Sequence, residues 1–420
     1  MRYKHRLMVP GPTPLPPEVT AAATWPLEDE RTPRFARLFV RVIDGLREVL
    51  RTRNDVLVFT SSMTGAFEGA IQNLFSPGDR VLVLNNGAFG ARWVDLCRVF
   101  GLDVVELSAP WGDEISPARV AAVLDGDPSI VAAVAVHSET STGVVNDMAG
   151  FGAVTRDVLS IVDTTSGAGA CDLRTDDWGL DVVVGGGQKA LMTPPGLAFA
   201  SLSERAWHFH RRAGLPRFYF DWTAAWKAFD REVPQSPWTP AITLLVQMDA
   251  ALRHLREEGL ERVLHRHLVL GRVTRAAVRA MGLTTLSPDD DRSAAVTTVF
   301  MPDGVDADQI VLEMGDRYGA QIVGGHGPLA GRVVRLGHCG YVDALDVITM
   351  IAALELTLRS LAVPIPAGAG VAAAVEATAR HSGAVPGLGA AGEAGDLALE
   401  AAGMGAPEPA VLATSARGGR

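Results

Sequence analysis

Short apolar runs alternate with segments of helical spacing through residues 34–260. The runs lie at 56–60, 81–84, 130–136, 158–162 and 182–184. They are nearly continuous and do not alternate with polar residues, which is typical of strands buried on both faces of a parallel sheet. Polar or glycine-rich residues follow each run directly. This pattern predicts an α/β domain in which a mostly parallel sheet lies between helices, with its binding site at the carboxyl ends of the strands.

The pattern changes towards the carboxyl end of this region. Residues 241–281 have the apolar spacing of one long helix. Shorter strands are then expected at 296–301 and 331–337, and helices near 306–317 and 342–361. This second group of elements predicts a smaller α+β domain.

Both ends of the chain differ from these domains in composition. The first residues are rich in proline, which fixes φ and removes amide donors, so an extended arm is expected. The last residues are rich in alanine and glycine and contain no aromatic side chain, so they have little to bury and predict a flexible tail with a short helix at 371–380. The expected division is an N-terminal arm (1–33), a large domain (34–260), a small domain (261–365) and a tail (366–420).

Composition narrows the possible classes of protein. The 420 residues are 48% hydrophobic and 20% charged, with a net charge of −10 and no long basic run. These values favour a globular enzyme in the cytoplasm and argue against nucleic-acid or membrane partners. No apolar segment has the length of a signal peptide or a membrane span. The three cysteines lack the spacing of metal ligands, so neither a metal site nor a disulfide framework is expected.

Two strand ends carry residues whose chemistry matches. Asp163 ends an apolar run in SIVDTTSGAG, and Lys189 follows a later run in GGGQKALMTPPG. A lysine amine can form a Schiff base with the aldehyde of pyridoxal 5′-phosphate (PLP), and an aspartate can keep the pyridine nitrogen protonated. Each residue alone is common, because most lysines lie on the surface and aspartates often cap turns. In this order, the pair predicts PLP chemistry at the α-carbon of an amino acid.

Other residues at strand ends supply candidate binding groups. In FTSSMTGAF, a strand leads into a helix, and the free amides and the hydroxyls of Ser62 and Thr64 can hold a phosphate, although an ordinary helix cap has the same pattern. Phe89 can stack on the cofactor ring or fill the core. Thr140, in HSETSTG, can hydrogen-bond the cofactor. Arg335, in the apolar strand GRVVRLG, can bind a carboxylate with two hydrogen bonds, although surface ion pairs are the more common role of arginine.

Together these motifs resemble the class V aminotransferases of the fold-type I PLP superfamily, in particular the alanine–glyoxylate and serine–glyoxylate (serine–pyruvate) aminotransferases. The resemblance extends from residue 10 to about residue 360. It rests on VPGPTPLPPEV, TGAFEGAIQNLFSPGD, HSETSTGV, VDTTSGAG, GGGQKALMTPPGLAF and GGHGPLAGRVVRLGHCG, in this order. It implies a fold-type I PLP-transferase, with a mostly parallel sheet of the seven-stranded type between helices and a smaller C-terminal α+β domain.

The resemblance also implies roles for individual residues. Lys189 would form the Schiff base and Asp163 would contact the pyridine nitrogen. The remaining cofactor contacts, predicted or implied, are Ser62, Met63, Thr64, Phe89, Thr140, Gln188 and Thr239. Arg335 and Pro12 would contact the substrate. The family places the threonine corresponding to Thr239 in the other subunit's site, so a homodimer with shared active sites is implied.

The predicted function is transfer of an amino group from a small L-amino acid, alanine or serine, to a small 2-oxo acid, glyoxylate or pyruvate, by a ping-pong mechanism. Two alternatives stay open at this point. A PLP lyase or aldolase-type enzyme would use the same lysine and aspartate. A non-catalytic protein with a PLP fold is the other alternative.

Overall fold

The computed structural model describes residues 4–287 and 292–381. Its largest sheet has seven strands in the order β2-β10-β9-β8-β5-β3-β4. Strand β10 is antiparallel to its two neighbours, and the other adjacent pairs are parallel. The strands are β2 (Asp55–Thr60), β3 (Arg80–Asn85), β4 (Asp103–Ser108), β5 (Ile130–Val136), β8 (Leu159–Asp163), β9 (Val182–Gly186) and β10 (Leu197–Leu202). The predicted α/β class with a mostly parallel sheet is confirmed.

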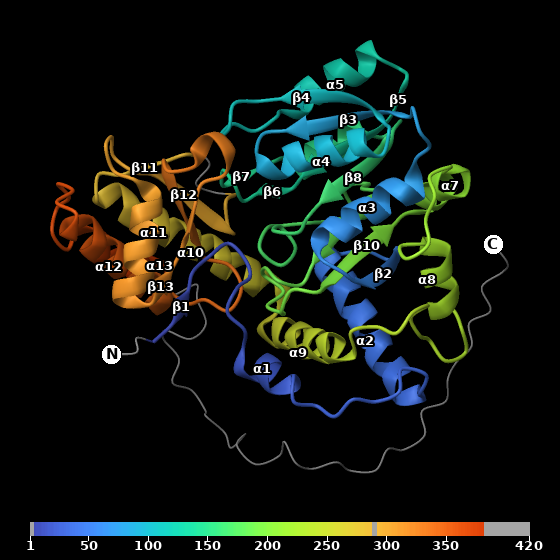
Figure 1. Ribbon diagram of the computed structural model, residues 1–420, viewed down its shortest axis with the longest axis horizontal. Coiled ribbons are helices and arrows are strands. Elements are labelled where there is room, and N and C mark those ends of the chain that lie inside the picture. Colours follow the sequence, from blue (N-terminus) through green and yellow to red (C-terminus); the bar gives the residue numbers. More distant parts are fainter. Residues whose placement is uncertain (1–3, 288–291, 382–420) are drawn as a thin grey trace.

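Helices cover both faces of this sheet (Figure 1). One apolar cluster joins the sheet to α2 (Pro33–Leu50), α5 (Pro117–Gly126), α6 (Met148–Val154) and α9 (Ile242–Glu258). The cluster on the opposite face joins it to α3 (Met63–Leu74), α4 (Ala88–Val99), α7 (Glu204–Arg212) and α8 (Trp222–Phe229). Because helices bury both faces, the inner strands are largely apolar, which is the pattern that the sequence contains, whereas the edge strand β4 mixes polar and apolar residues.

A second group of elements packs around its own core, on the left in Figure 1. Its antiparallel sheet has the order β11-β12-β15-β14. These strands are β11 (Thr284–Thr285), β12 (Val296–Phe300), β14 (Val323–Gly324) and β15 (Val333–Gly337). The helices are α10 (Leu260–Ala280), α11 (Ala307–Tyr318), the 3-10 helix η1 (Gly327–Leu329), α12 (Ala344–Ser360) and α13 (Ala369–His381). The remaining short elements are β1 (Arg6–Leu7), α1 (Pro17–Ala22), β6 (Ser138–Glu139), β7 (Val144–Val145) and β13 (Ala320–Gln321).

Three expectations about elements are corrected. The long helix expected at 241–281 is two helices, because Gly259 has φ 86 and ends α9 before α10 begins. The N-terminal arm is not uniformly extended, since it contains β1 and α1. The short helix expected at 371–380 is present as α13 (Ala369–His381), but it packs on α10 and α12 and is not part of a flexible tail. Small side chains allow this close packing, and a Cβ on Gly370 would lie 2.9 Å from Met281. The rest of the tail, 382–420, lies outside the described residues.

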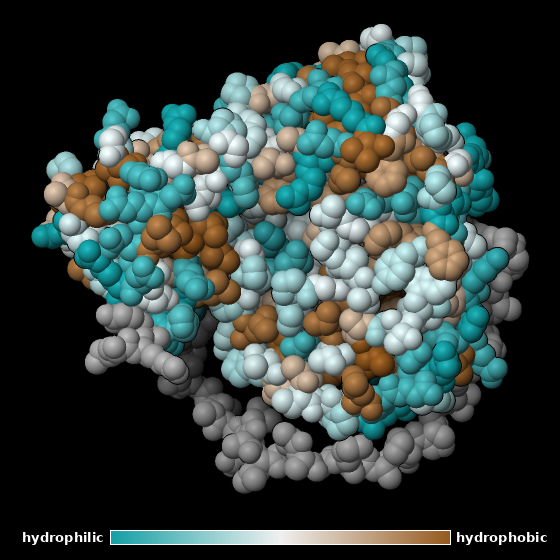
Figure 2. All heavy atoms as spheres, in the orientation of Figure 1, coloured by the Kyte–Doolittle hydropathy of each residue, from teal (hydrophilic) through white to brown (hydrophobic). Residues whose placement is uncertain are grey.

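The surface is mixed in character. The face drawn in Figure 2 has hydrophobic residues distributed between hydrophilic ones. Several exposed large apolar side chains lie on helices that pack with the smaller sheet, among them Leu312, Leu345, Leu356 and Val375. Within residues 4–287 and 292–381, no helix combines the length and apolar character needed to cross a membrane.

Candidate active site

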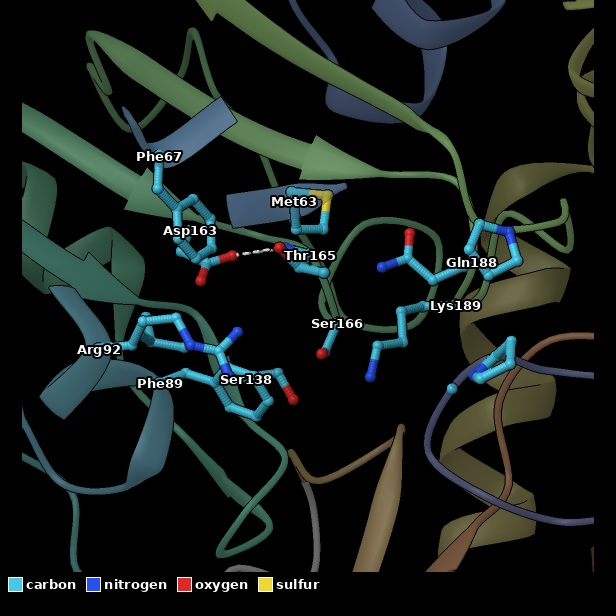
Figure 3. A pocket seen from close by; sticks show the side chains of 14 residues that line it. Met63, Phe67, Phe89, Arg92, Ser138, Asp163, Thr165, Ser166, Gln188 and Lys189 are labelled. Atoms are coloured by element: carbon cyan, nitrogen blue, oxygen red, sulfur yellow. Dashed lines mark hydrogen bonds between the residues drawn. The ribbon is translucent and has the colours of Figure 1, made fainter. Parts of the chain in front are cut away.

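A cavity of about 240 Å³ opens at the carboxyl ends of β5, β8 and β9, beside the amino ends of α3 and α4. Figure 3 shows side chains converging on it from these elements. The predicted site residues that line it are Pro12, Met63, Phe89, Asp163, Gln188 and Lys189. Five other predicted residues are not among those that line the cavity in the described part of the chain: Ser62, Thr64, Thr140, Thr239 and Arg335. The cavity is therefore at the position where open parallel sheets bind ligands.

Lys189 follows β9 and extends its side chain into the cavity. The residue is 9% exposed, and its Nζ donates a hydrogen bond of 2.6 Å to the carbonyl oxygen of Pro10. Burial lowers the pKa of the amine from 10.5 to about 8, because the charged form loses hydration. A substantial fraction of the amine is therefore neutral near physiological pH, which is the form that attacks carbonyl carbons.

Asp163 is the last residue of β8 and is 2% exposed. One carboxylate oxygen accepts a hydrogen bond of 2.9 Å from the backbone nitrogen of Thr165 and another from its hydroxyl. In Figure 3, the second oxygen faces the open part of the cavity. Burial raises the pKa of Asp163, and hydrogen bonding from Thr165 and Trp93 opposes this. A cation placed at the second oxygen would hold the carboxylate in its ionised form.

The N-terminus of α3 gives the cavity a site for an anion. Its N-cap residue, Ser62, makes no side-chain hydrogen bond to the first turn, so the amides of that turn are not capped by it. Met63, in this turn, and Gln188 both line the cavity. Unpaired amides and the helix dipole favour negative charge, so a phosphate fits this end of the cavity.

The N-terminus of α4 is filled by side chains of the chain itself. Glu139 is fully buried, and its Oε2 accepts hydrogen bonds from the backbone nitrogens of Phe89 (3.0 Å) and Gly90 (3.1 Å). The hydroxyl of Ser141 accepts a third from Ala88 (2.9 Å). Burial raises the pKa of Glu139, and these hydrogen bonds oppose it. Glu139 thus fixes the turn that carries Phe89, a role that the sequence analysis missed because nothing in HSETSTG shows which helix its carboxylate caps.

Arg335 is buried on β15 and belongs to the smaller sheet. Its Nε donates to the carbonyl of Gly324 (2.7 Å) and its Nη1 to the carbonyl of Thr140 (3.2 Å). Burial lowers the pKa of the guanidinium to about 10, and the charge of Glu139 opposes this. The guanidinium therefore reaches the turn between β6 and β7 from the other group of elements, and it is close enough to Lys189 to lower the pKa of that amine.

For two residues the structure differs from what the sequence indicated: one predicted residue lies in a separate pocket outside the cavity, and one residue that was not predicted lines the cavity. Thr239 lines a separate small pocket, together with Thr60 and Tyr219. Arg92 was missed, although it lines the main cavity and its guanidinium carbon lies 4.9 Å from the centroid of the Phe89 ring. Its spacing from Phe89 along α4 is the signal that was available, since residues three apart share a helix face.

These groups fit PLP. A pyridine ring with an aldehyde and a phosphate needs an amine, an acid for the ring nitrogen, an aromatic face and an anion site, and this cavity brings one of each together. The hydroxyl oxygen of Thr140 is also buried without a hydrogen-bond partner among the described residues, but Thr140 does not line this cavity, so the fit rests on the other groups.

Comparison with known proteins gives the same assignment. The family model described as Aminotransferase class-V matches residues 28–344. A Synechococcus protein named soluble hydrogenase, small subunit, is 40% identical over 89% of this chain and 98% of its own length. The L-aspartate–glyoxylate aminotransferase of Paracoccus denitrificans is 37% identical over 90% of this chain and 96% of its own. The crystal structure of ureidoglycine–glyoxylate aminotransferase from Bacillus subtilis superposes with a TM-score of 0.86, at 28% identity over 90% of this chain and 99% of that one. The chain belongs to the class V aminotransferases, and it is a PLP-dependent aminotransferase acting on amino acids and 2-oxo acids.

Proposed function

We propose that Lys189 is the residue that binds the cofactor aldehyde and that its amine moves the α-proton of the substrate. The observation that carries this proposal is a buried amine, with its pKa lowered to about 8, in the same cavity as the carboxylate of Asp163. A neutral amine can add to an aldehyde and can accept a proton, whereas a fully protonated one can do neither.

The other residues bind and orient. Bound PLP supplies an aldehyde that exchanges between amines and a protonated ring that accepts an electron pair from the α-carbon. Asp163 holds the proton on the ring nitrogen through its second oxygen. The amides of Met63 and Thr64 bind the phosphate with Gln188, and Phe89 covers the ring. Each of these is positioned by backbone that packs into the core, which limits reorganisation during the reaction.

Arg335 is the proposed site of the substrate carboxylate. Two of its donors hold backbone carbonyls, which leaves the rest of the guanidinium fork for a carboxylate. Pro12, in the cavity lining, would limit the length of the substrate side chain. The proposed donors are alanine or serine, and the proposed acceptors are glyoxylate or pyruvate. Glyoxylate is supported by the names of the Paracoccus and Bacillus relatives.

Arg92 favours an acidic amino donor as a second candidate. No carboxylate within residues 4–287 and 292–381 forms an ion pair with its guanidinium, which lines the cavity. The Paracoccus relative is named for aspartate. Comparing Arg92→Gln with wild type on alanine and on aspartate separates the candidates. A selective loss of about 10-fold or more in kcat/KM for aspartate supports the acidic donor. An equal change for both supports the small neutral donors.

A homodimer with shared sites is proposed as well. Thr239 lies outside the cavity of its own chain, next to an aromatic group in which Phe218 is 76% exposed and stacks on Trp238 with ring centroids 4.9 Å apart. An exposed aromatic surface of this kind is typical of a protein interface. Across such an interface Thr239 would contact the phosphate bound by the partner. Light scattering after size-exclusion chromatography tests this, and a monomer at micromolar concentration contradicts it.

The central experiment identifies which lysine binds the cofactor, and it is simple to interpret because the chain has few lysines. The chain contains only Lys4, Lys189 and Lys227. Borohydride reduction of the PLP-loaded protein, followed by peptide mass spectrometry, should place the cofactor on Lys189 alone. Lys189→Ala should lose the adduct, the visible absorbance and turnover, whereas Lys227→Ala should keep all three. An adduct on another lysine, or retained turnover in Lys189→Ala, would overturn the assignment.

A further inference from the structure

The N-terminal arm contacts Lys189 at its amine and at its backbone. The carbonyl of Pro10 accepts the hydrogen bond of 2.6 Å from Nζ. Three residues later, the hydroxyl of Thr13 donates to the carbonyl of Lys189 at 2.7 Å, and its backbone nitrogen donates to Gln188 at 3.2 Å. Thr13 is 3% exposed, so these hydrogen bonds are shielded from water. The arm therefore holds both ends of this lysine.

The same arm is bonded to β13 and to β15, the strand that carries Arg335. Strand β1 pairs in parallel with β13 in a separate two-stranded sheet, and the nitrogen of Met8 donates to the carbonyl of Gln321 at 2.9 Å. The nitrogen of Gly337 donates to the carbonyl of Met8 at 2.8 Å. Gly337 ends β15 two residues after Arg335. A continuous backbone path thus runs from the strand of Arg335 through Met8 to the carbonyl of Pro10.

Glycines allow close approach at both ends of this path. A Cβ on Gly337 would lie 2.2 Å from the carbonyl oxygen of Val9, and one on Gly11 would lie 2.2 Å from Cδ of Lys189. Gly11 also has φ 136, which strains any other residue. The arm is held between the lysine and β15 without space for a methyl group, so a displacement at β15 is passed to the Pro10 carbonyl.

We propose that the Pro10 carbonyl orients the Lys189 amine whenever that amine is free, and that β15 sets the position of this carbonyl through Gly337 and Met8. A carbonyl oxygen only accepts, so it takes an N–H and leaves the lone pair of the neutral amine directed elsewhere. The inference rests on the proposed role of Lys189. Pro10, Met8 and Gly337 are positioning residues, because none of them is required to touch the substrate.

Loss of this acceptor has a predictable sign. A hydrogen bond to a carbonyl stabilises the charged amine more than the neutral one, so its loss lowers the pKa of Lys189. The other charged or titratable groups that face this amine from the surrounding elements are Asp163, Glu139, His326, Arg335 and Cys339. Gly337→Ala replaces none of these side chains, but Arg335 lies two residues away on the same strand. Variants of Thr13, which lies off β15, therefore separate loss of the acceptor from a movement of Arg335.

The test measures the amine directly in the cofactor-free protein. Lysine labelled with ¹³C at Cε gives three signals, which Lys4→Arg and Lys227→Arg assign. In Gly337→Ala, the titration midpoint of Lys189 should fall by about one pH unit or more. The matched control is Gly315→Ala on α11, where a Cβ meets nothing within 4 Å, and its midpoint should equal that of wild type. An unchanged midpoint in Gly337→Ala, or equal shifts in both variants, overturns the proposal.

A second pair of variants decides the question if Gly337→Ala does not fold. Thr13→Val removes the hydroxyl that binds the Lys189 carbonyl, whereas Thr13→Ser keeps it. The midpoint should fall in the valine variant and return to within a few tenths of a pH unit of wild type in the serine variant. Wild-type titration in both overturns the proposal. Since no PLP is present, these results are independent of the borohydride experiment, which tests the role of Lys189 itself.

Discussion

Replacement of Lys189 by methionine tests whether the chain keeps this amine at a cost in stability. Burial lowers the pKa of the amine from 10.5 to about 8. At 1.36 kcal/mol per pH unit, this difference corresponds to about 3 kcal/mol of unfolding free energy. Methionine is unbranched and uncharged, so the variant avoids the cost. At pH 7 we expect it to be more stable by up to about 3 kcal/mol, reduced by a pH-independent cost of leaving the Pro10 carbonyl without its donor.

The dependence on pH separates these two contributions. Between about pH 8 and 10.5, the unfolded chain binds a proton at Lys189 that the folded chain does not bind. The unfolding free energy of wild type therefore rises with pH across this window. Below about pH 8 both states bind the proton, so the contribution is constant. The advantage of Lys189→Met over wild type should fall by about 3 kcal/mol as the pH rises through the window.

Urea unfolding of the cofactor-free proteins at several pH values measures this difference. Titrating groups that do not face Lys189 contribute equally to both proteins and cancel. The control is Lys227→Met, because Lys227 is exposed on α8, and its difference from wild type should not vary with pH. If the difference for Lys189→Met is also constant, or increases with pH, burial does not disfavour the charged amine and the reasoning is refuted.

Asp163, Arg335 and Lys189 each give a further expected result. Asp163→Asn should still bind PLP but lower kcat at least about 10²-fold, because the amide no longer places a negative charge at the ring nitrogen; PLP titration and steady-state kinetics measure the two effects. Arg335→Lys should raise KM for the amino donor roughly 10- to 100-fold, because an ammonium cannot bind a carboxylate with a planar fork, and an unchanged KM contradicts the assignment. Capture of PLP by the cofactor-free protein should accelerate about tenfold per pH unit up to about pH 8 and then level off, because the neutral amine is the nucleophile. The visible absorbance of the adduct measures the rate of capture. A rate that does not change across this pH range contradicts the lowered pKa of Lys189.

Strands β4 and β10 were not predicted from the sequence, and β4 is a partly exposed edge strand that mixes polar with apolar residues. The other five strands of the large sheet were predictable because they are mostly buried. Their apolar runs are continuous, and each ends at a polar or glycine-rich residue, which located Asp163 and Lys189 at the edge where the cavity lies. The break at Gly259 was also readable, since a glycine that follows charged residues of a helix is a common terminator. It was missed because apolar spacing continues on both sides of it.

Other features depend on contacts between distant segments. Glu139 caps a helix that begins about 50 residues earlier in the chain, and the paired segments share no sequence pattern. A short helix was predicted at 371–380, but its packing on α10 and α12 was not, because a segment rich in alanine and glycine has little apolar surface to indicate a partner. The position of Pro10 beside the Lys189 amine follows from two separate pairings of the arm. Such features require the three-dimensional arrangement.

The charges around the cavity explain why ligand binding and stability should be linked. Burial disfavours the charged forms of Lys189 and Arg335, and it raises the pKa of Asp163 and Glu139. Glu139 is satisfied within the chain by backbone donors, whereas Asp163 and Arg335 keep atoms available for a ligand. A protonated ring nitrogen beside Asp163 would reduce the free-energy cost of burying its carboxylate. A substrate carboxylate beside Arg335 would do the same for the guanidinium. Ligands that relieve such costs stabilise the folded state by mass action. The same groups thus reduce the stability of the ligand-free chain and form the part that binds.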